Sequence, residues 1–177
     1  MKIYKTKIKD LLIIKQKINR DKRGNLRETF NDKLLNKKFL FEYCTTSKIN
    51  VLRGFHFQTK FKQAKYVNVV KGKILDVVID LRKKSKTFGK TFKIILSKKN
   101  AIGLFIPAGF GHAYYSFEKE NIIYYKLDNY YMPKYENGII YNDKHLKIKW
   151  PRKKMIVSKK DNNLLSFDTF CNTFNGL

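Results

Sequence analysis

"AKYVNVVKGKILDVVIDL", residues 64–81, consists of two runs of strand-forming residues joined by a short basic linker. Valine, isoleucine and tyrosine dominate both runs, and these side chains favour extended backbone. Gly72 lies in the centre of the KGK linker, where a tight reversal needs a residue that tolerates positive φ. We therefore expect two strands joined by a hairpin at Gly72.

The same pattern continues on both sides of this segment. Short apolar runs alternate with polar turns at even spacing over residues 39–47, 50–58, 91–97, 104–107, 112–117 and 121–131. Such spacing is typical of an all-β sandwich or barrel. Residues 31–39 predict one short helix, and the segment after Trp150 predicts one or two more.

The length of 177 residues suits a single domain spanning 1–177, and 15% aromatic content argues for a folded core. The two cysteines, Cys44 and Cys171, are far apart, which argues against a disulfide framework and favours a reduced, cytoplasmic setting. The apolar run at residues 11–14 is too short for a signal-peptide core or a membrane span.

Charge is the most unusual feature of the composition. Lysine and arginine number 39 against 14 acidic residues, a formal net charge of +25. An anionic partner would explain the excess, and so would a lysine-rich surface with no specific partner. Because the lysines are spread along the whole chain, we favour a plain basic surface or a small phosphorylated ligand over nucleic acid, and expect no membrane partner.

His56 is one of only three histidines, and it lies inside the strand pattern VLRGFHFQ at residues 51–58. Strict alternation puts Phe55 and Phe57 on the opposite face from His56. Arg53 also has the opposite parity, unless Gly54 hosts a bulge that turns both side chains inward. A lone strand histidine that is simply hydrogen-bonded to a carbonyl is the competing interpretation.

Two further residues favour proton chemistry. IPAGFGHAYYSF, residues 106–117, places His112 on a strand, and Tyr125 is in phase with its apolar neighbours and should point inward. PAGFGH resembles the second motif of the cupin superfamily. The first cupin metal motif needs two histidines and a glutamate, whereas this chain has HFQ. We therefore expect a cupin-like barrel whose histidines do acid–base work, with no metal and no cofactor.

Several motifs in order resemble the dTDP-4-dehydrorhamnose 3,5-epimerase family across roughly residues 20–161. They are DKRGNLRETF, VLRGFHFQ, QAKYVNVVKGKILDVVIDLR, SKTFGK, IPAGFGHAYYSF, YKLDNYYMP, NGIIYND and IKWP. The resemblance implies a cupin-like jelly-roll barrel with short peripheral helices, usually a homodimer in which N-terminal elements cross between subunits. It also implies a nucleoside-diphosphate 4-keto-6-deoxy sugar as substrate, epimerised at C3, C5 or both without a cofactor.

The resemblance assigns the catalytic roles. His56 matches the base that removes the proton next to the ketone, and Asp161 matches the carboxylate that pairs with that histidine. Tyr125 matches the residue that reprotonates the opposite face.

Substrate-binding roles come from the same resemblance. Lys65 and His112 match positions near the sugar and its ketone oxygen. Arg53 and Arg23 match positions that hold the diphosphate or nucleotide, and Glu28 completes the Arg-Gly-x-x-x-Glu segment.

One segment departs from the family pattern. Thymidine-linked enzymes typically have Gln-x-Asn where this chain has Phe41-Glu42-Tyr43. Aromatic rings could stack on a larger base, which makes a guanosine-linked sugar, including a 4-keto heptose of capsule or O-antigen synthesis, a serious candidate. A catalytically inactive sugar-binding cupin relative and a basic nucleic-acid-binding β-barrel are the alternative functions.

Overall fold

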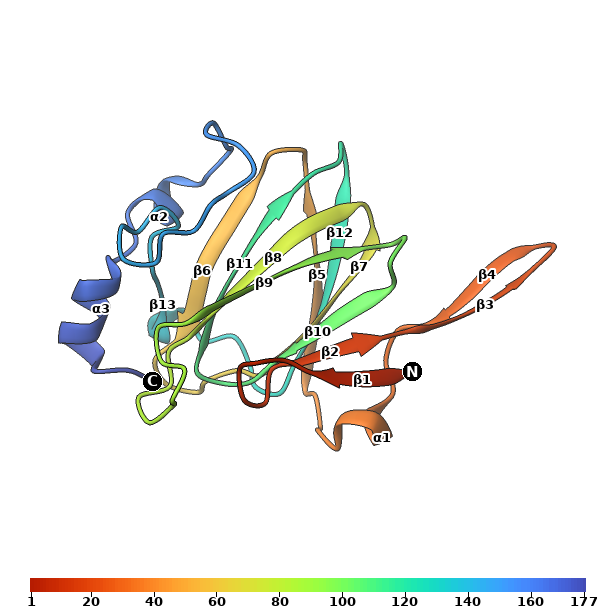
Figure 1. The fold of residues 1–177 in the computed structure, drawn as a ribbon, viewed down its shortest axis with the longest axis horizontal. Helices are drawn as coiled ribbons and strands as arrows, with labels where there is room; N and C mark the ends of the chain where they lie inside the picture. The colour runs from red at the N-terminus through yellow and green to blue at the C-terminus, as the bar shows by residue number, and fades with distance from the viewer.

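The computed structural model describes residues 1–177, and most of its strands form two facing antiparallel sheets (Figure 1). The six-stranded sheet has the order β1 (Lys2–Lys5), β2 (Leu12–Lys15), β10 (Ile102–Ile106), β7 (Lys65–Lys71), β12 (Asn121–Leu127) and β5 (Phe41–Ser47). The five-stranded sheet has the order β13 (Glu136–Gly138), β6 (Leu52–Gln58), β11 (Phe110–Ser116), β8 (Lys73–Asp80) and β9 (Thr91–Ser97). The expected all-β jelly roll is confirmed.

Short helices lie at the periphery, as expected. They are α1 (Asp32–Leu35), the 3-10 turn η1 (Pro133–Tyr135), α2 (Lys159–Asn162) and α3 (Phe167–Phe174). Helices α2 and α3 lie on the outer side of the five-stranded sheet in Figure 1. Each begins at a serine, Ser158 or Ser166, whose side chain accepts a hydrogen bond from a backbone N–H of the first turn.

The expected hairpin at Gly72 is wrong. β7 and β8 flank this glycine but belong to different sheets, and each pairs with strands distant in sequence. Gly72 has φ of 84°, and a Cβ there would lie 2.5 Å from Asn121 Oδ1, so glycine makes a sharp corner between the two sheets. The turns between β9 and β10 and between β11 and β12 change sheets in the same way.

Two apolar cores explain why β8 and β11 are apolar on both faces. The core between the sheets contains residues such as Val67, Val78 and Ile123. The second core lies where Phe55 and Phe57 pack with Phe170 of α3 on the outer face. A sheet buried on both faces lacks the usual apolar–polar alternation.

The N-terminal strands were not predicted from the sequence. Besides β1 and β2, the chain forms a two-stranded hairpin of β3 (Lys17–Asp21) and β4 (Gly24–Glu28). Figure 1 shows this hairpin projecting away from the two sheets. Its side chains are mostly exposed, including Leu26 at 67%, so the apolar pattern that marks a half-buried strand is missing.

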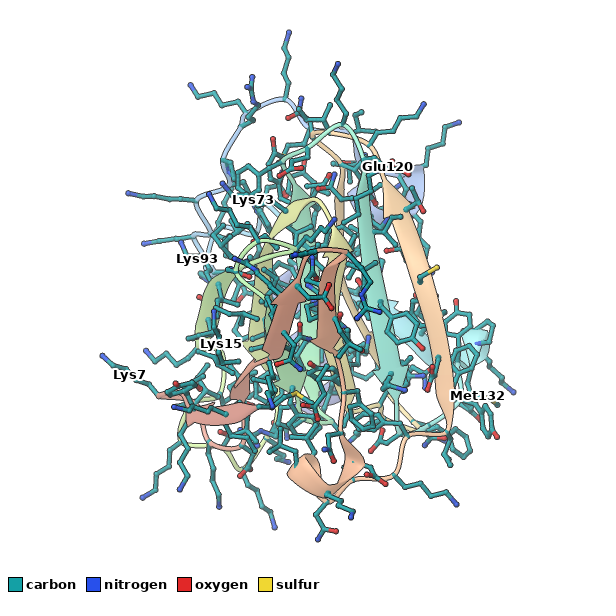
Figure 2. All side chains as sticks on the ribbon, turned by 90° about the vertical axis from the view of Figure 1, so that its right-hand side faces the viewer. Lys7, Lys15, Lys73, Lys93, Glu120 and Met132 are labelled. Carbon is teal, nitrogen blue, oxygen red and sulfur yellow. The ribbon has the colours of Figure 1, made fainter.

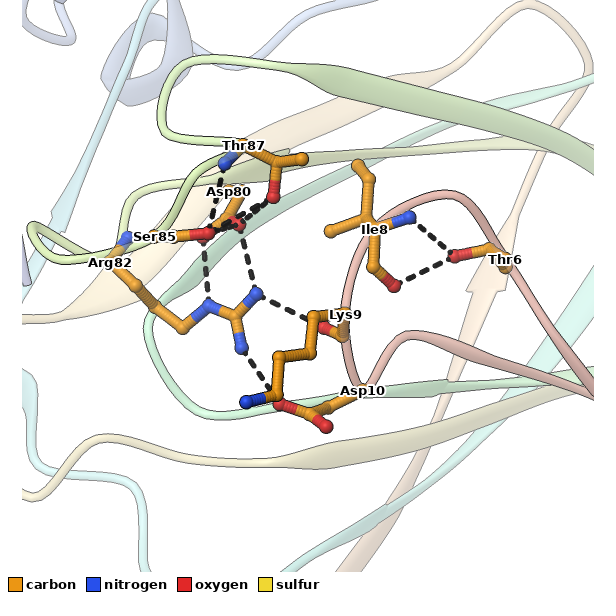
Figure 3. Close-up of polar contacts among 8 residues, drawn as sticks. All are labelled: Thr6, Ile8, Lys9, Asp10, Asp80, Arg82, Ser85 and Thr87. Atoms are coloured by element: carbon orange, nitrogen blue, oxygen red, sulfur yellow. Dashed lines mark hydrogen bonds and ion pairs between the residues drawn. The ribbon is translucent and has the colours of Figure 1, made fainter.

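An ion pair between the buried Asp80 and the half-buried Arg82 ties the β1–β2 turn to the loop between β8 and β9 (Figure 3). The Asp80 carboxylate accepts bonds from Arg82 Nε at 2.9 Å and from the Ser85 and Thr87 hydroxyls at 2.6 Å. Arg82 also donates to the Lys9 carbonyl at 3.0 Å. Burial would raise the pKa of Asp80, but these hydrogen bonds outweigh it and hold the pKa below its usual value.

The positive charge is distributed over the surface. Figure 2 shows side chains with nitrogen tips projecting around the outline of the molecule, with the labelled Lys7, Lys15, Lys73 and Lys93 coming from different elements. Both cysteines are free. None of the helices has the length and apolar character needed to span a bilayer.

Candidate active site

A β-bulge in β6 turns Arg53 and His56 to the same face of the sheet. His56 pairs with His112 of β11, and Arg53 pairs with Tyr114, so three steps along β6 match two along β11. Gly54 in this bulge has φ of 112°, and a Cβ there would lie 2.4 Å from the His112 carbonyl oxygen. Only glycine fits this backbone, and the bulge expected at this position is confirmed.

The C-terminal segment carries Asp161 to His56. Ile156 forms a parallel bridge with Val51 beside β6, and helix α2 follows directly. Asp161 is only 3% exposed, and its Oδ1 lies 2.8 Å from His56 Nε2. Its Oδ2 accepts a hydrogen bond from the Gly54 N–H at 3.1 Å.

Asp161 is ionised in this setting. Burial would raise its pKa, but the hydrogen bond and charge of His56 and the Gly54 N–H outweigh burial and lower the pKa. An ionised carboxylate only accepts hydrogen bonds, so His56 Nε2 carries a proton and Nδ1 is left free when the ring is neutral.

A second histidine–carboxylate pair lies inside the barrel. His112 Nε2 is 2.8 Å from Asp76 Oδ2, and both side chains are buried. The other oxygen of Asp76 has no hydrogen-bond partner. The His112 ring makes an edge-type contact with Tyr125 of the opposite sheet, at a centroid distance of 6.1 Å. This contact joins β11 to β12 across the interior.

Tyr125 points inward, as expected from its phase, and is 3% exposed. Its ring stacks on Tyr43, the residue directly opposite on β5, with centroids 4.7 Å apart and an interplanar angle of 20°. Burial, with the nearby Tyr114 and Tyr43, raises the pKa of Tyr125 well above its usual value. Its phenol therefore stays protonated over the physiological pH range.

A pocket of about 360 Å³ opens beside His56. Its lining is half apolar and includes Phe41, Tyr43, His56, Gln58, Gln63, Lys65, Tyr131 and Glu136. Larger hollows of about 1100 and 860 Å³ lie elsewhere, lined mainly by lysine, arginine and polar side chains of strand ends and turns. Neither contains a histidine, whereas the smaller pocket contains His56.

Two charged groups, Lys65 and Glu136, line this pocket. Lys65 shares a face of β7 with the core residues Val67 and Val69. Burial lowers the pKa of Lys65 to about 8, while Glu136 and Asp76 oppose the shift. Burial would raise the pKa of Glu136, but hydrogen bonds from Lys160 and Tyr131 and the charge of His56 lower it.

The structure brings together some of the residues expected at the site and not others. His56, Asp161, Lys65, His112 and Tyr125 converge on the pocket or the interior next to it. Arg53 is exposed on the same face, and its Nε donates to Ser47 Oγ at 3.2 Å.

Within one chain, Arg23 and Glu28 lie apart from the expected site residues that converge on the pocket. Arg23 lies at the tip of the projecting hairpin, where its 91% exposed side chain pairs with Asp21. Glu28 accepts a hydrogen bond from Asn31 at 3.0 Å at the base of the hairpin.

Several residues of the site were missed in the sequence. Asp76 carries a detectable signal, because it is an acid flanked on both sides by apolar residues in the run ILDVVI. A carboxylate in a strand buried on both faces needs a partner. Glu136, Gln63 and Tyr131 lie in polar segments with no periodicity, and no local pattern distinguishes them. No group of three or more His, Cys, Asp or Glu side chains is placed to hold a metal ion.

Comparisons with known proteins agree with this geometry. The family model described as dTDP-4-dehydrorhamnose 3,5-epimerase matches residues 5–169. The dTDP-4-dehydrorhamnose 3,5-epimerase of Shigella flexneri is 38% identical over 170 residues, covering 92% of this chain and 94% of the relative.

Solved structures give the same result. The dTDP-4-dehydrorhamnose 3,5-epimerase of Elizabethkingia anophelis superposes with a TM-score of 0.89 at 35% identity, covering 96% of this chain and 97% of the other. A Legionella pneumophila dTDP-6-deoxy-D-glucose-3,5-epimerase, solved with dTDP-4-keto-L-rhamnose, has a TM-score of 0.88 at 36% identity, with coverage of 92% and 90%.

The fold and the two histidine–carboxylate pairs thus define a sugar epimerase of the cupin-like jelly-roll class. This chain belongs to the dTDP-4-dehydrorhamnose 3,5-epimerase family, and the resemblance seen in its motifs is confirmed. The protein is accordingly an enzyme, an isomerase.

The environment of Lys65 leads to a titration prediction. NMR of ¹³C-labelled lysines should show one side chain with a midpoint near pH 8, below which its ammonium is charged, whereas ordinary lysines titrate near pH 10.4. Lys65→Met should remove that signal, and Lys71→Met, at an exposed pair with Glu120, should leave it. Glu136→Gln should lower the midpoint further, because Glu136 favours the charged form. A set of lysines that all titrate above pH 10 would contradict this environment.

Proposed function

We propose that this protein inverts C3, C5 or both of a nucleoside-diphosphate 4-keto-6-deoxy sugar or 4-keto heptose. The observation that carries the proposal is the placement of a histidine–carboxylate pair and a protonated phenol on opposite sheets. His56 lies on β6 of the five-stranded sheet and is paired with Asp161. Tyr125 lies on β12 of the six-stranded sheet. Inversion requires a base on one face of the sugar and an acid on the other, and this arrangement supplies both.

The chemistry follows from the ketone. A C–H bond next to C4 is weakly acidic because the ketone oxygen takes up the charge as an enolate. His56 Nδ1 removes this proton, and the Asp161 carboxylate stabilises the resulting imidazolium. Tyr125 then delivers a proton to the opposite face of the carbon, which inverts it. The tyrosinate recovers its proton from solvent, and His56 releases the one it took.

Lys65 and His112 complete the site. A cation or hydrogen-bond donor near the ketone oxygen stabilises the enolate, an effect worth roughly 3 kcal/mol by analogy with an oxyanion-hole donor. With a pKa near 8, Lys65 is mostly charged at neutral pH yet is placed to give up a proton. His112 is held by Asp76 and lies against the proton donor Tyr125.

The diphosphate is bound by arginines, one of which comes from a second copy of the chain. Arg53 is exposed next to the site and offers its fork to phosphate oxygens. Arg23 and Glu28 lie on the β3–β4 hairpin, which projects away from the two sheets in Figure 1, and neither lines their own chain's pocket. A homodimer in which this hairpin reaches the partner's pocket gives them the substrate-binding role expected from the family pattern.

Between the two candidate nucleotides, guanosine diphosphate and thymidine diphosphate, this proposal favours guanosine diphosphate. Phe41 and Tyr43 line the pocket where the thymidine-linked pattern has amides, with ring centroids 5.7 Å apart. One face of Tyr43 is occupied by Tyr125, which leaves Phe41 as the freer ring for stacking. A guanine offers a larger stacking area than thymine, and stacking is worth roughly 1–3 kcal/mol per base. The enzyme would act in the cytoplasm, in surface polysaccharide synthesis.

Isotope exchange tests the mechanism. In D₂O with a thymidine- or guanosine-linked 4-keto-6-deoxy sugar, His56→Asn should slow deuterium entry at C3 and C5 by about 100- to 10,000-fold, because the base is lost. Tyr125→Phe should still exchange but form little inverted product. His145→Asn is the matched control, since His145 pairs with Asp168 at the surface. Exchange at the normal rate in His56→Asn would remove His56 from the mechanism.

Calorimetry tests which nucleotide the protein binds more tightly. GDP should bind the unmodified protein about tenfold more tightly than dTDP, a difference of about 1.4 kcal/mol. Phe41→Gln should narrow this gap, because it removes the free ring and restores an amide. Phe117→Gln, which replaces a half-buried ring outside the pocket, should leave the gap unchanged. If dTDP binds more tightly than GDP, the guanosine assignment is wrong.

A further inference from the structure

We propose that Tyr43 is a positioning residue for Tyr125, so that it sets how often the enolate is reprotonated on the inverting face. This inference rests on the epimerase function proposed above. The family pattern has an amide at this position, so the role would be a property of this chain rather than of the motif.

Tyr43 is placed by the backbone to do this. β5 and β12 are antiparallel neighbours, and Tyr43 is the direct partner of Tyr125 in their register. Side chains of directly opposite residues lie on the same face of a sheet and contact each other. The two rings are nearly parallel, with centroids 4.7 Å apart, a favourable offset-stacking separation.

The Tyr125 ring is therefore held between two other rings. Tyr43 covers one side, and the His112 ring approaches at 6.1 Å with an interplanar angle of 66°. His112 is itself fixed by Asp76 at 2.8 Å. Loss of Tyr43 would leave the donor with freedom to turn and with water where a ring had been.

Tyr43 also lines the pocket, whereas Tyr125 does not. The ring of Tyr43 thus lies both at the pocket wall and against the donor behind it. Burial raises the pKa of Tyr43 to about 12, so its own hydroxyl stays protonated as well. A group in this position controls the approach of the donor to a bound sugar more directly than it controls the base His56.

The enolate has two fates, and their ratio compares proton delivery by Tyr125 with proton return by His56. In D₂O, His56 exchanges the proton it took with solvent and gives back a deuteron to the original face, which yields labelled substrate of unchanged configuration. Tyr125 gives a deuteron to the opposite face, which yields inverted product. A displaced Tyr125 lowers the second rate and leaves the first, so the ratio of inverted product to labelled substrate falls.

The experiment compares three variants at saturating substrate. Tyr43→Ala should lower the ratio by at least about tenfold, since small misplacements of catalytic groups carry large rate costs. Tyr43→Leu keeps bulk without a ring and should lower it as well. Tyr43→Phe keeps the stack and should retain a ratio close to that of the unmodified protein. Adding Tyr43→Ala to Tyr125→Phe should lower the ratio no further, because the donor is already absent.

The results that would overturn this inference differ from the result that would overturn the proposed function as well. A normal ratio in Tyr43→Ala, with only KM raised, would mean that Tyr43 binds the nucleotide and does not position the donor, and would overturn the inference. So would a raised ratio, which would mean that Tyr43 obstructs Tyr125. If the unmodified protein neither exchanges nor inverts either nucleotide sugar, the proposed function and this inference fail together. Thermal melting of each variant confirms that the fold survives.

Discussion

The carboxylate of Asp161 is the interaction on which the site depends. One oxygen accepts the Gly54 N–H of the β6 bulge, and the other holds His56 Nε2 at 2.8 Å. A buried carboxylate without partners is costly, so the two bonds are needed for the charge to be retained. Asp161 thereby fixes the strand irregularity and the histidine together. Because α2 begins with Ser158 as its N-cap, the C-terminal segment has a defined position from which to supply it.

The two-sheet topology explains how one barrel supplies groups to both faces of a substrate. Successive strands change sheets at corners such as Gly72, so residues from different parts of the chain face one interior. His56 and His112 come from the five-stranded sheet, and Lys65 and Tyr125 come from the six-stranded sheet. Inversion at carbon requires a base on one face of the substrate and an acid on the other, and groups on opposite sheets can supply both. The Tyr43–Tyr125 stack belongs to the six-stranded sheet and faces the same interior.

Local sequence patterns predicted the fold class and the inward orientation of Tyr125, because strand alternation depends only on neighbouring residues. They also indicated the Gly54 bulge. They did not indicate which sheet each strand joins, since the turn at Gly72 has the same chemistry whether it closes a hairpin or a corner. The β3–β4 hairpin was not predicted because its exposed, polar strands lack an apolar face. Glu136 and the Asp76 pair depend on contacts between distant segments, which no local pattern contains.

The most direct test of this account is the rate of solvent deuterium exchange in Asp161→Asn. The neutral amide of this variant cannot stabilise the imidazolium as a charged partner, so exchange should fall by about 100- to 10,000-fold while the protein stays folded. Asp143→Asn is the matched control, because Asp143 is also a buried carboxylate that accepts backbone N–H groups, including that of Phe167, and should exchange normally. Exchange near the normal rate in folded Asp161→Asn would contradict the central role of this carboxylate.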